Sequence, residues 1–151
     1  MARVREYAAT RGVTIEVRRF GATTRTAEDA AREIGTDVAR IVKSLVFVAD
    51  ESPVIALCSG GTRVDEAALA RAVGVPAVRR ARPDEAKALT GYAIGGVSPF
   101  AHVTACTVVA DEALLGFDVV WAAAGLPDAV FAIAPRDLMR VADAKVARIA
   151  G

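Results

Sequence analysis

Lys43 stands in a run of apolar residues, where a charged side chain is unexpected. Residues 41–49 are apolar except at positions 43 and 44, which predicts a strand buried on both faces. Only three of the 19 basic residues are lysines. An ammonium among apolar neighbours must find an acceptor, lose its proton or extend to water. The first two outcomes imply a polar pocket within the sheet, and the third describes an ordinary lysine at a strand edge.

A glycine-rich turn follows in the second half of the chain. Residues 90–100 contain three glycines and one proline. Adjacent glycines permit conformations closed to other residues, and the proline stiffens the exit. Such a turn can direct several backbone N–H groups at one point and form an anion or oxyanion site. An ordinary tight connection is the alternative. The candidate substrate-binding residues of the turn are Gly95, Gly96, Val97, Ser98 and Pro99.

Other side chains are weaker candidates. His102, the only histidine, could be a general base near neutral pH, or a residue of the pocket wall or the surface. Arg79, Arg80 and Arg82 form the densest basic cluster and could bind phosphates, with a solvated face as the alternative. Cys58 lies in an apolar run, which favours a core thiol over a nucleophilic thiolate.

The composition is that of a folded protein, expected to form one domain over residues 1–151. The chain is 54% hydrophobic and 25% charged, which argues against disorder. Its net charge of +1 means that any nucleic acid must be bound by local clusters. No apolar run reaches the roughly 18 residues of a membrane span, and no signal peptide is evident. The expected location is therefore the cytoplasm. One histidine and two distant cysteines offer no zinc spacing.

Hydrophobic periodicity and capping residues predict a mixture of helices and strands. Helices are expected at 4–11, 27–34, 65–73, 83–89 and 135–141. Strands are expected at 13–20, 41–49, 54–58, 75–78, 104–110, 117–123, 130–133 and 146–149, with a turn at 21–24 and a turn or short helix at 111–115. This order predicts a mixed sheet flanked by helices, in an α/β or mixed α+β fold.

The motifs, taken in order, resemble a known family. They are a capped helix at 26–35, the strand 41–46, Arg63-Val64-Asp65 before a helix, Thr90-Gly91-Tyr92, and the run 95–100. In this order they resemble the YbaK/prolyl-tRNA synthetase-associated domain family over nearly the whole chain. The run 120–125 is similar to a free-standing bacterial branch of that family.

The resemblance implies a trans-editing aminoacyl-tRNA deacylase, which hydrolyses the ester between a wrong amino acid and its tRNA. It implies Lys43 as the catalytic residue, the turn 95–99 as the substrate-binding loop, a curved mixed sheet, and neither metal nor cofactor. The expected substrate is tRNA(Pro) carrying a small non-cognate amino acid such as Cys or Ala, bound at its 3′ end. Prolyl-tRNA synthetase is a candidate partner, the arginine cluster a candidate tRNA contact, and a monomer or a homodimer is expected.

Two positions depart from the family pattern. Phe20 stands where some members have a tyrosine that touches substrate, so it is expected to keep only an apolar pocket wall. Ala101 replaces the glycine of a Pro-Phe-Gly-His run. These departures favour an alternative, a non-catalytic module that binds tRNA or a synthetase, whereas Lys43 and the intact turn favour the deacylase. A hydrolase of another small ester or nucleotide is a third interpretation.

Overall fold

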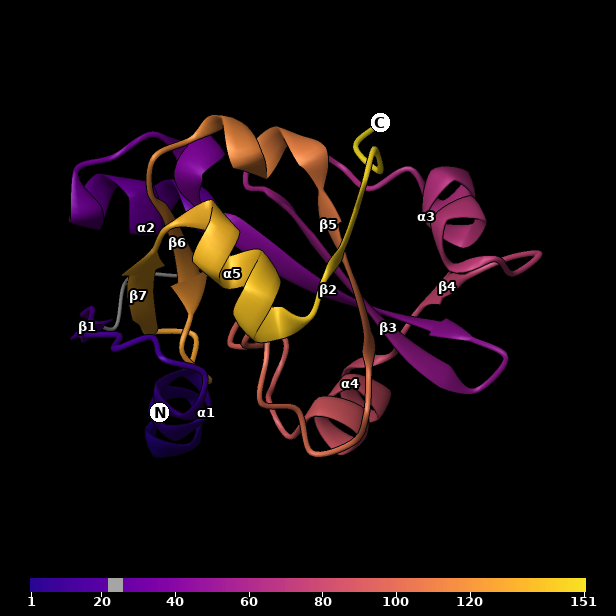
Figure 1. The fold of residues 1–151 in the computed structure, drawn as a ribbon, viewed down its shortest axis with the longest axis horizontal. Helices are drawn as coiled ribbons and strands as arrows, with labels where there is room; N and C mark the ends of the chain where they lie inside the picture. The colour runs from indigo at the N-terminus through magenta and orange to yellow at the C-terminus, as the bar shows by residue number, and fades with distance from the viewer. Residues whose placement is uncertain (22–25) are drawn as a thin grey trace.

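A long hairpin built from the apolar run around Lys43 forms the centre of the molecule (Figure 1). The computed structural model describes residues 1–21 and 26–151. β2 (Val42–Ala49) and β3 (Ser52–Ser59) pair antiparallel over their whole length. Asp50 and Glu51 turn the chain between them with positive φ angles. The strands predicted at 41–49 and 54–58 are therefore confirmed, and the two form one hairpin.

The strands form two sheets. The larger has the order β4-β2-β3-β5-β8 and is mixed, because β5 runs parallel to β3 and to β8 while β2 runs antiparallel to its neighbours. The smaller is antiparallel, with the order β1-β7-β6. An isolated bridge between Ile41 and Trp121 links the two sheets. The mixed α/β class is confirmed, with two sheets in place of the single one expected. The other strands are β1 (Val17–Arg19), β4 (Arg79–Arg80), β5 (Thr107–Asp111), β6 (Val120–Ala123), β7 (Ala129–Ile133) and β8 (Lys145–Ala147).

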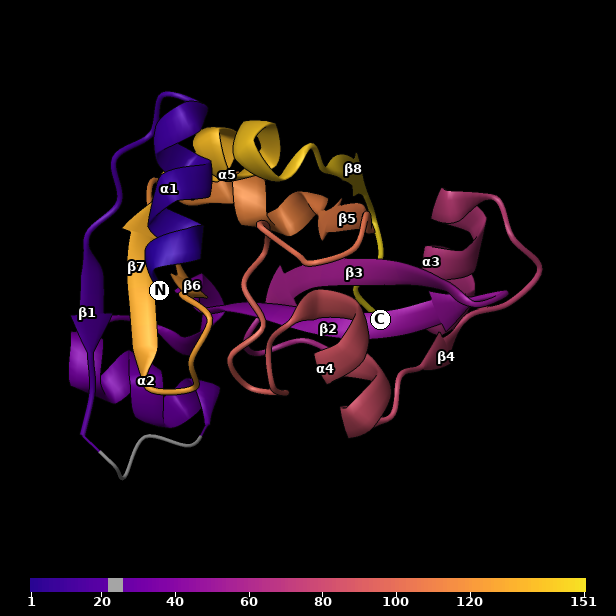
Figure 2. The same ribbon diagram turned by 90° about the horizontal axis from the view of Figure 1, so that it is seen from below.

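The helices begin and end where capping residues predicted. The Thr26 hydroxyl accepts from the Asp29 N–H at the start of α2, Pro83 opens α4, and Gly35, in the left-handed region, ends α2. α1, α4 and α5 contribute to the apolar cluster that contains Val42 and Val46, whereas α3 packs on the opposite face of the larger sheet. Figure 2 shows α5 toward the β8 edge of this sheet and α4 toward its β4 edge. No helix within the described ranges is long and apolar enough to cross a bilayer. The helices are α1 (Ala2–Thr10), α2 (Ala27–Ile34), α3 (Glu66–Val73), α4 (Pro83–Thr90) and α5 (Pro135–Ala142), with 3-10 turns η1 (Val38–Arg40) and η2 (Glu112–Gly116).

Several strands differ from the prediction because other hydrogen bonds compete for their backbone. The strand predicted at 75–78 is wrong, since the Val75 N–H donates to the end of α3 and pairing with β2 begins only at Arg79. Thr104 donates its N–H to the Leu89 carbonyl, so β5 starts three residues later than expected. The strands predicted at 13–20, 117–123 and 146–149 are shortened or shifted to 17–19, 120–123 and 145–147. The turn predicted at 21–24 lies, beyond Gly21, outside the described residues.

Alternation along β2 sends neighbouring side chains into different parts of the core. Val42 and Val46 join the main cluster, which extends to the glycine turn and to α5. On the other face, Ile41 packs against α2, and Phe47 packs against α3. Lys43 therefore lies between the clusters of Ile41 and Phe47, whereas Ser44 lies on the face of the main cluster, between Val42 and Val46.

Candidate functional site

A pocket of about 240 Å³ opens at the uncovered edge of β2. β4 pairs with β2 only at Phe47 and Val48, and the pairing with β6 is a single bridge at Ile41, just before β2. Among the described residues, no strand pairs with residues 43–45 between these two points on that edge. The two sheets and the glycine turn enclose the space that remains, so the fold creates a cavity where its strand pairing is interrupted.

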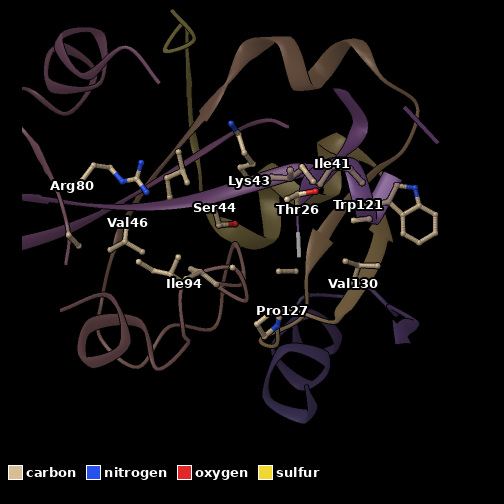
Figure 3. A pocket seen from close by; sticks show the side chains of 18 residues that line it. Thr26, Ile41, Lys43, Ser44, Val46, Arg80, Ile94, Trp121, Pro127 and Val130 are labelled. Atoms are coloured by element: carbon tan, nitrogen blue, oxygen red, sulfur yellow. The ribbon is translucent and has the colours of Figure 1, made fainter. Parts of the chain in front are cut away.

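The walls of the pocket are mostly apolar (Figure 3). The polar or charged side chains that line it are those of Thr26, Lys43, Ser44 and Arg80, and no described lining residue is a carboxylate. A site of this kind suits a neutral apolar group with a negatively charged or polar end nearby. The apolar lining is formed by Ala27, Ala30, Ile41, Val42, Leu45, Val46, Ala81, Ile94, Val97, Trp121, Ala123, Pro127 and Val130, together with Gly95.

Lys43 lines the pocket, but its ammonium points to the opposite side of β2 from the Ser44 side chain (Figure 3). There Lys43 Nζ donates to the carbonyl oxygen of Thr62. Lys43 forms no ion pair with any carboxylate of the described residues, so its positive charge is not neutralised by a side chain. Of the three outcomes that the sequence left open for this ammonium, the structure shows the first, and the acceptor is a backbone carbonyl.

Cys58 is the cross-strand neighbour of Lys43 and is fully buried. Burial raises the pKa of the Cys58 thiol, and the nearby Lys43 charge opposes this shift only in part. The thiol therefore stays protonated at neutral pH, in agreement with the interpretation of Cys58 as a core residue.

Ser44 is the polar side chain directed toward Ile94 and the glycine turn (Figure 3). Its Oγ is buried and has no hydrogen-bond partner among the described residues. Sequence analysis missed Ser44 because the strand was interpreted as apolar on both faces. The available signal was a hydroxyl in an otherwise apolar run, on the face shared with Val42 and Val46.

The glycine turn contributes to the pocket through some of its predicted residues and supports it through the others. Gly95 and Val97 line the cavity. Gly96, Ser98 and Pro99 are buried behind this wall. The Gly96 N–H donates to the Ala93 carbonyl at 2.9 Å, and the Ser98 hydroxyl accepts from the Phe100 N–H at 3.3 Å. The turn is thus held by its own hydrogen bonds, and the Gly96 N–H is already used within it.

His102 and Phe20 lie outside the pocket lining. His102 Nε2 is 2.7 Å from the Ser98 carbonyl oxygen, which can only accept, so Nε2 carries a proton. Burial lowers the pKa of His102, which keeps the ring neutral at neutral pH. His102 therefore supports the turn from behind. Phe20 packs against the cluster of Ala30 and Ile41, two residues that do line the pocket.

The three arginines predicted to contact tRNA have different surroundings. Arg79 donates to both carboxylate oxygens of Glu85 at 2.8 Å, and Arg82 lies 3.4 Å from Asp84. The hydrogen bond from Arg79 is the main reason that the pKa of Glu85 falls to about 2, so this pair persists at any physiological pH. Arg80 lines the pocket, stands 5.5 Å from the Phe47 ring and has no ion pair among the described residues. Of the three arginines, Arg80 is thus the one that has no carboxylate partner among the described residues.

Ala101 adopts a backbone conformation that favours glycine, and we expect Ala101→Gly to cost little stability although the alanine is buried. Its φ is +65°, where a Cβ costs about 1–2 kcal/mol. Two losses offset this gain: about 0.4–1 kcal/mol from the greater freedom of glycine in the unfolded chain, and about 0.8 kcal/mol from the buried methyl group. The free energy of unfolding, measured in urea, should therefore stay close to the wild-type value. Ala86→Gly, also buried but within α4, is the control and should lower it by about 2 kcal/mol. An equal loss in the two variants would contradict this account of the turn.

The chain is similar to proteins of a known family. Residues 22–141 match the family described as aminoacyl-tRNA editing domain. The chain is 43% identical to a crystal structure described as that of a proposed trans-editing enzyme for prolyl-tRNA synthetase, with a TM-score of 0.93, covering 99% of this chain and 96% of that one. It is 32% identical to the uncharacterized protein YwhH of Bacillus subtilis, over 87% of this chain and 83% of YwhH.

A shorter match places the same kind of domain within a larger enzyme. The chain is 34% identical to the proline–tRNA ligase of Lactobacillus gasseri over 60% of its own length, which corresponds to 16% of the ligase. The match therefore concerns a small part of that enzyme and not its ligase activity as a whole. Because the family match spans most of the chain and the fold agrees along its whole length, the chain belongs to the aminoacyl-tRNA editing domain family.

Proposed function

We propose that the protein hydrolyses mischarged aminoacyl-tRNA, and that its substrate is tRNA(Pro) carrying a small non-cognate amino acid such as Cys or Ala. The pocket at the open edge of β2 carries this proposal. Its volume of about 240 Å³ lies below the range of roughly 300–1,000 Å³ typical of sites for drug-sized ligands, which suits a small aminoacyl group. Its apolar walls suit a side chain without charge.

The reaction needs little from the protein because an aminoacyl ester is already reactive. Water adds to the ester carbonyl carbon, the bond to the ribose oxygen breaks, and that oxygen takes a proton as the free amino acid leaves. A cation near the carbonyl stabilises the negative charge that develops on its oxygen. Lys43 would supply this charge, or hold the terminal phosphate or ribose. An ammonium has three N–H donors, so Lys43 can bind substrate without releasing the Thr62 carbonyl.

The attacking water is activated by the substrate itself in this proposal. The free hydroxyl of the terminal ribose and the α-amine of the amino acid both lie next to the ester and can accept a proton. The placement of His102 behind the glycine turn supports this choice, since its ring does not line the pocket and its Nε2–H is bound to Ser98. The protein then acts by positioning and by charge.

One observation favours the alternative function, a module that binds tRNA or a synthetase without hydrolysis. The Lys43 ammonium is bound to Thr62 and directed away from Ile94 and Pro127 (Figure 3).

The experiment that distinguishes the two functions incubates the protein with tRNA(Pro) charged with Ala, Cys or Pro, with and without prolyl-tRNA synthetase, and measures the released amino acid. We expect release of Ala or Cys well above the spontaneous rate. Binding of these tRNAs without release would establish the module instead. A tRNA substrate would place the protein in the cytoplasm.

Arg80→Ala should weaken tRNA binding more than Arg79→Ala. Arg80 lines the pocket and has no carboxylate partner among the described residues, whereas both carboxylate oxygens of Glu85 accept from Arg79. Loss of one phosphate contact should reduce the slope of log K against log salt concentration by about one unit. Binding of labelled tRNA across a salt series measures this slope. Equal effects of the two substitutions would refute the assignment of Arg80 as the phosphate contact.

A further inference from the structure

Ser44 carries an unsatisfied hydroxyl in the wall of the pocket. Its Oγ is almost fully buried and has no hydrogen-bond partner among the described residues, although Ser44 lines the pocket. A buried hydroxyl without a partner lowers stability, and folded proteins rarely leave one in this state. The other serine buried in this hairpin behaves differently, because Ser59 Oγ donates to the Ala39 carbonyl at 2.8 Å. Ser44 is therefore a local exception that a bound group could explain.

The backbone of Ser44 is also open toward the pocket. The Ile41 carbonyl accepts from Gly60 on the β3 side, and the Val46 carbonyl accepts from Ala81 at 2.9 Å on the β4 side. Because N–H and C=O groups alternate between the two edges of an antiparallel strand, those of Ser44 face the same edge as those of Val46. No described strand pairs with β2 at Ser44 on that edge. Ser44 thus presents an N–H donor, a carbonyl acceptor and a hydroxyl at one point of the pocket.

We propose that Ser44 positions the aminoacyl group by binding its α-amine and its carbonyl oxygen; this inference rests on the proposed function. An aminoacyl ester has a donor, the α-amine, next to an acceptor, the ester carbonyl. Ser44 offers the complementary set: its carbonyl and hydroxyl oxygens accept from the amine, and its N–H donates to the ester carbonyl. The substrate then pairs with the open edge of β2 as a short strand would.

The charges around the pocket agree with this mode of recognition. No described lining residue is a carboxylate, so the pocket holds no anion that could bind the amine as an ion pair. Lys43 and Arg80 are cations, which disfavour a protonated amine. Neutral acceptors on Ser44 can bind the amine in its uncharged form. Lys43 and Ser44 then have separate tasks, since the first supplies charge and the second orients the amino acid.

The test combines Ser44→Ala with a substrate that lacks the amine. We expect Ser44→Ala to lower kcat/KM for alanyl-tRNA(Pro) by about 10- to 100-fold and to leave hydrolysis of propionyl-tRNA(Pro) near the wild-type rate. If the mischarged panel selects cysteine, cysteinyl and 3-mercaptopropionyl esters take their place. Ser44→Thr keeps the hydroxyl and should retain most of the activity. The Tm of Ser44→Ala should be unchanged or higher, because the substitution removes an unsatisfied polar group.

Ser59→Ala is the matched control. It removes a hydroxyl that has a partner, so its Tm should fall while the preference for alanyl over propionyl ester stays at the wild-type value. Wild-type activity of Ser44→Ala, an equal loss on both esters, or a fall in its Tm would each overturn the proposal for Ser44 and leave deacylation standing. If the wild-type protein releases no amino acid from any mischarged tRNA, the proposed function itself fails.

Discussion

Lys43→Ala is expected to lower kcat/KM for hydrolysis of mischarged tRNA(Pro) by at least about 100-fold. Removing one group that stabilises a developing oxyanion typically costs 10²- to 10³-fold in rate. Lys43 is the lysine of the pocket lining, and no carboxylate of the described residues neutralises its charge. Release of amino acid from charged tRNA under single-turnover conditions measures the effect on the chemical step.

The fold should survive this substitution, which keeps the result interpretable. Lys43 is only partly buried, and its ammonium contacts one carbonyl, that of Thr62, which is itself partly exposed and can be hydrated in the variant. The loss of unfolding free energy should be about 1 kcal/mol. Lys87→Ala, on the exposed side of α4, is the control for loss of positive charge and should keep full activity. Near-normal turnover by Lys43→Ala would remove Lys43 from the mechanism.

The local signals in the sequence predicted the helices and the central hairpin well. Thr26, Gly35, Pro83 and Gly91 stand at the helix ends where their backbone or side-chain chemistry is needed. The strand predicted at 75–78 failed because the Val75 N–H donates to the Ala70 carbonyl and ends α3, a local hydrogen bond that apolar periodicity does not report. Whether strands belong to one sheet or two depends on long-range pairing, such as the bridge at Trp121, and no local pattern encodes it.

The candidate site was predicted in part, for a related physical reason. Lys43 and the turn at 95–99 were identified from residue type and from family resemblance, and the structure brings Lys43, Gly95 and Val97 to one pocket. Ser44 was missed because its importance depends on which part of the β2 edge stays unpaired among the described residues, and this is set by long-range pairing. His102 was considered as a base, but its position behind the turn follows from a hydrogen bond to Ser98 that spacing alone does not predict.

Gly96→Ala is expected to damage both stability and activity, although its φ is not in the left-handed region. A Cβ on Gly96 would lie 2.8 Å from the carbonyl carbon of Leu126 and 2.9 Å from the Pro127 nitrogen. These are backbone atoms, so no side chain can rotate away and one of the two segments must move. Overpacking of this kind costs about 1–3 kcal/mol of unfolding free energy. Chemical denaturation measures this loss.

The effect on activity follows because the two segments in contact form facing parts of one pocket. Gly95 and Val97 flank the substituted residue, and Pro127 lies on the other segment, and all three line the cavity. Misplacing a substrate by about 1 Å commonly costs about 100-fold in rate. The value of kcat/KM should therefore fall by about 10- to 100-fold when one of these segments moves. Gly116→Ala is the control, since its Cβ would meet no atom within 4 Å, and it should change neither quantity measurably. A Gly96→Ala variant with wild-type kcat/KM would mean that the distance between these walls does not limit catalysis, and that the substrate is held at the β2 edge alone.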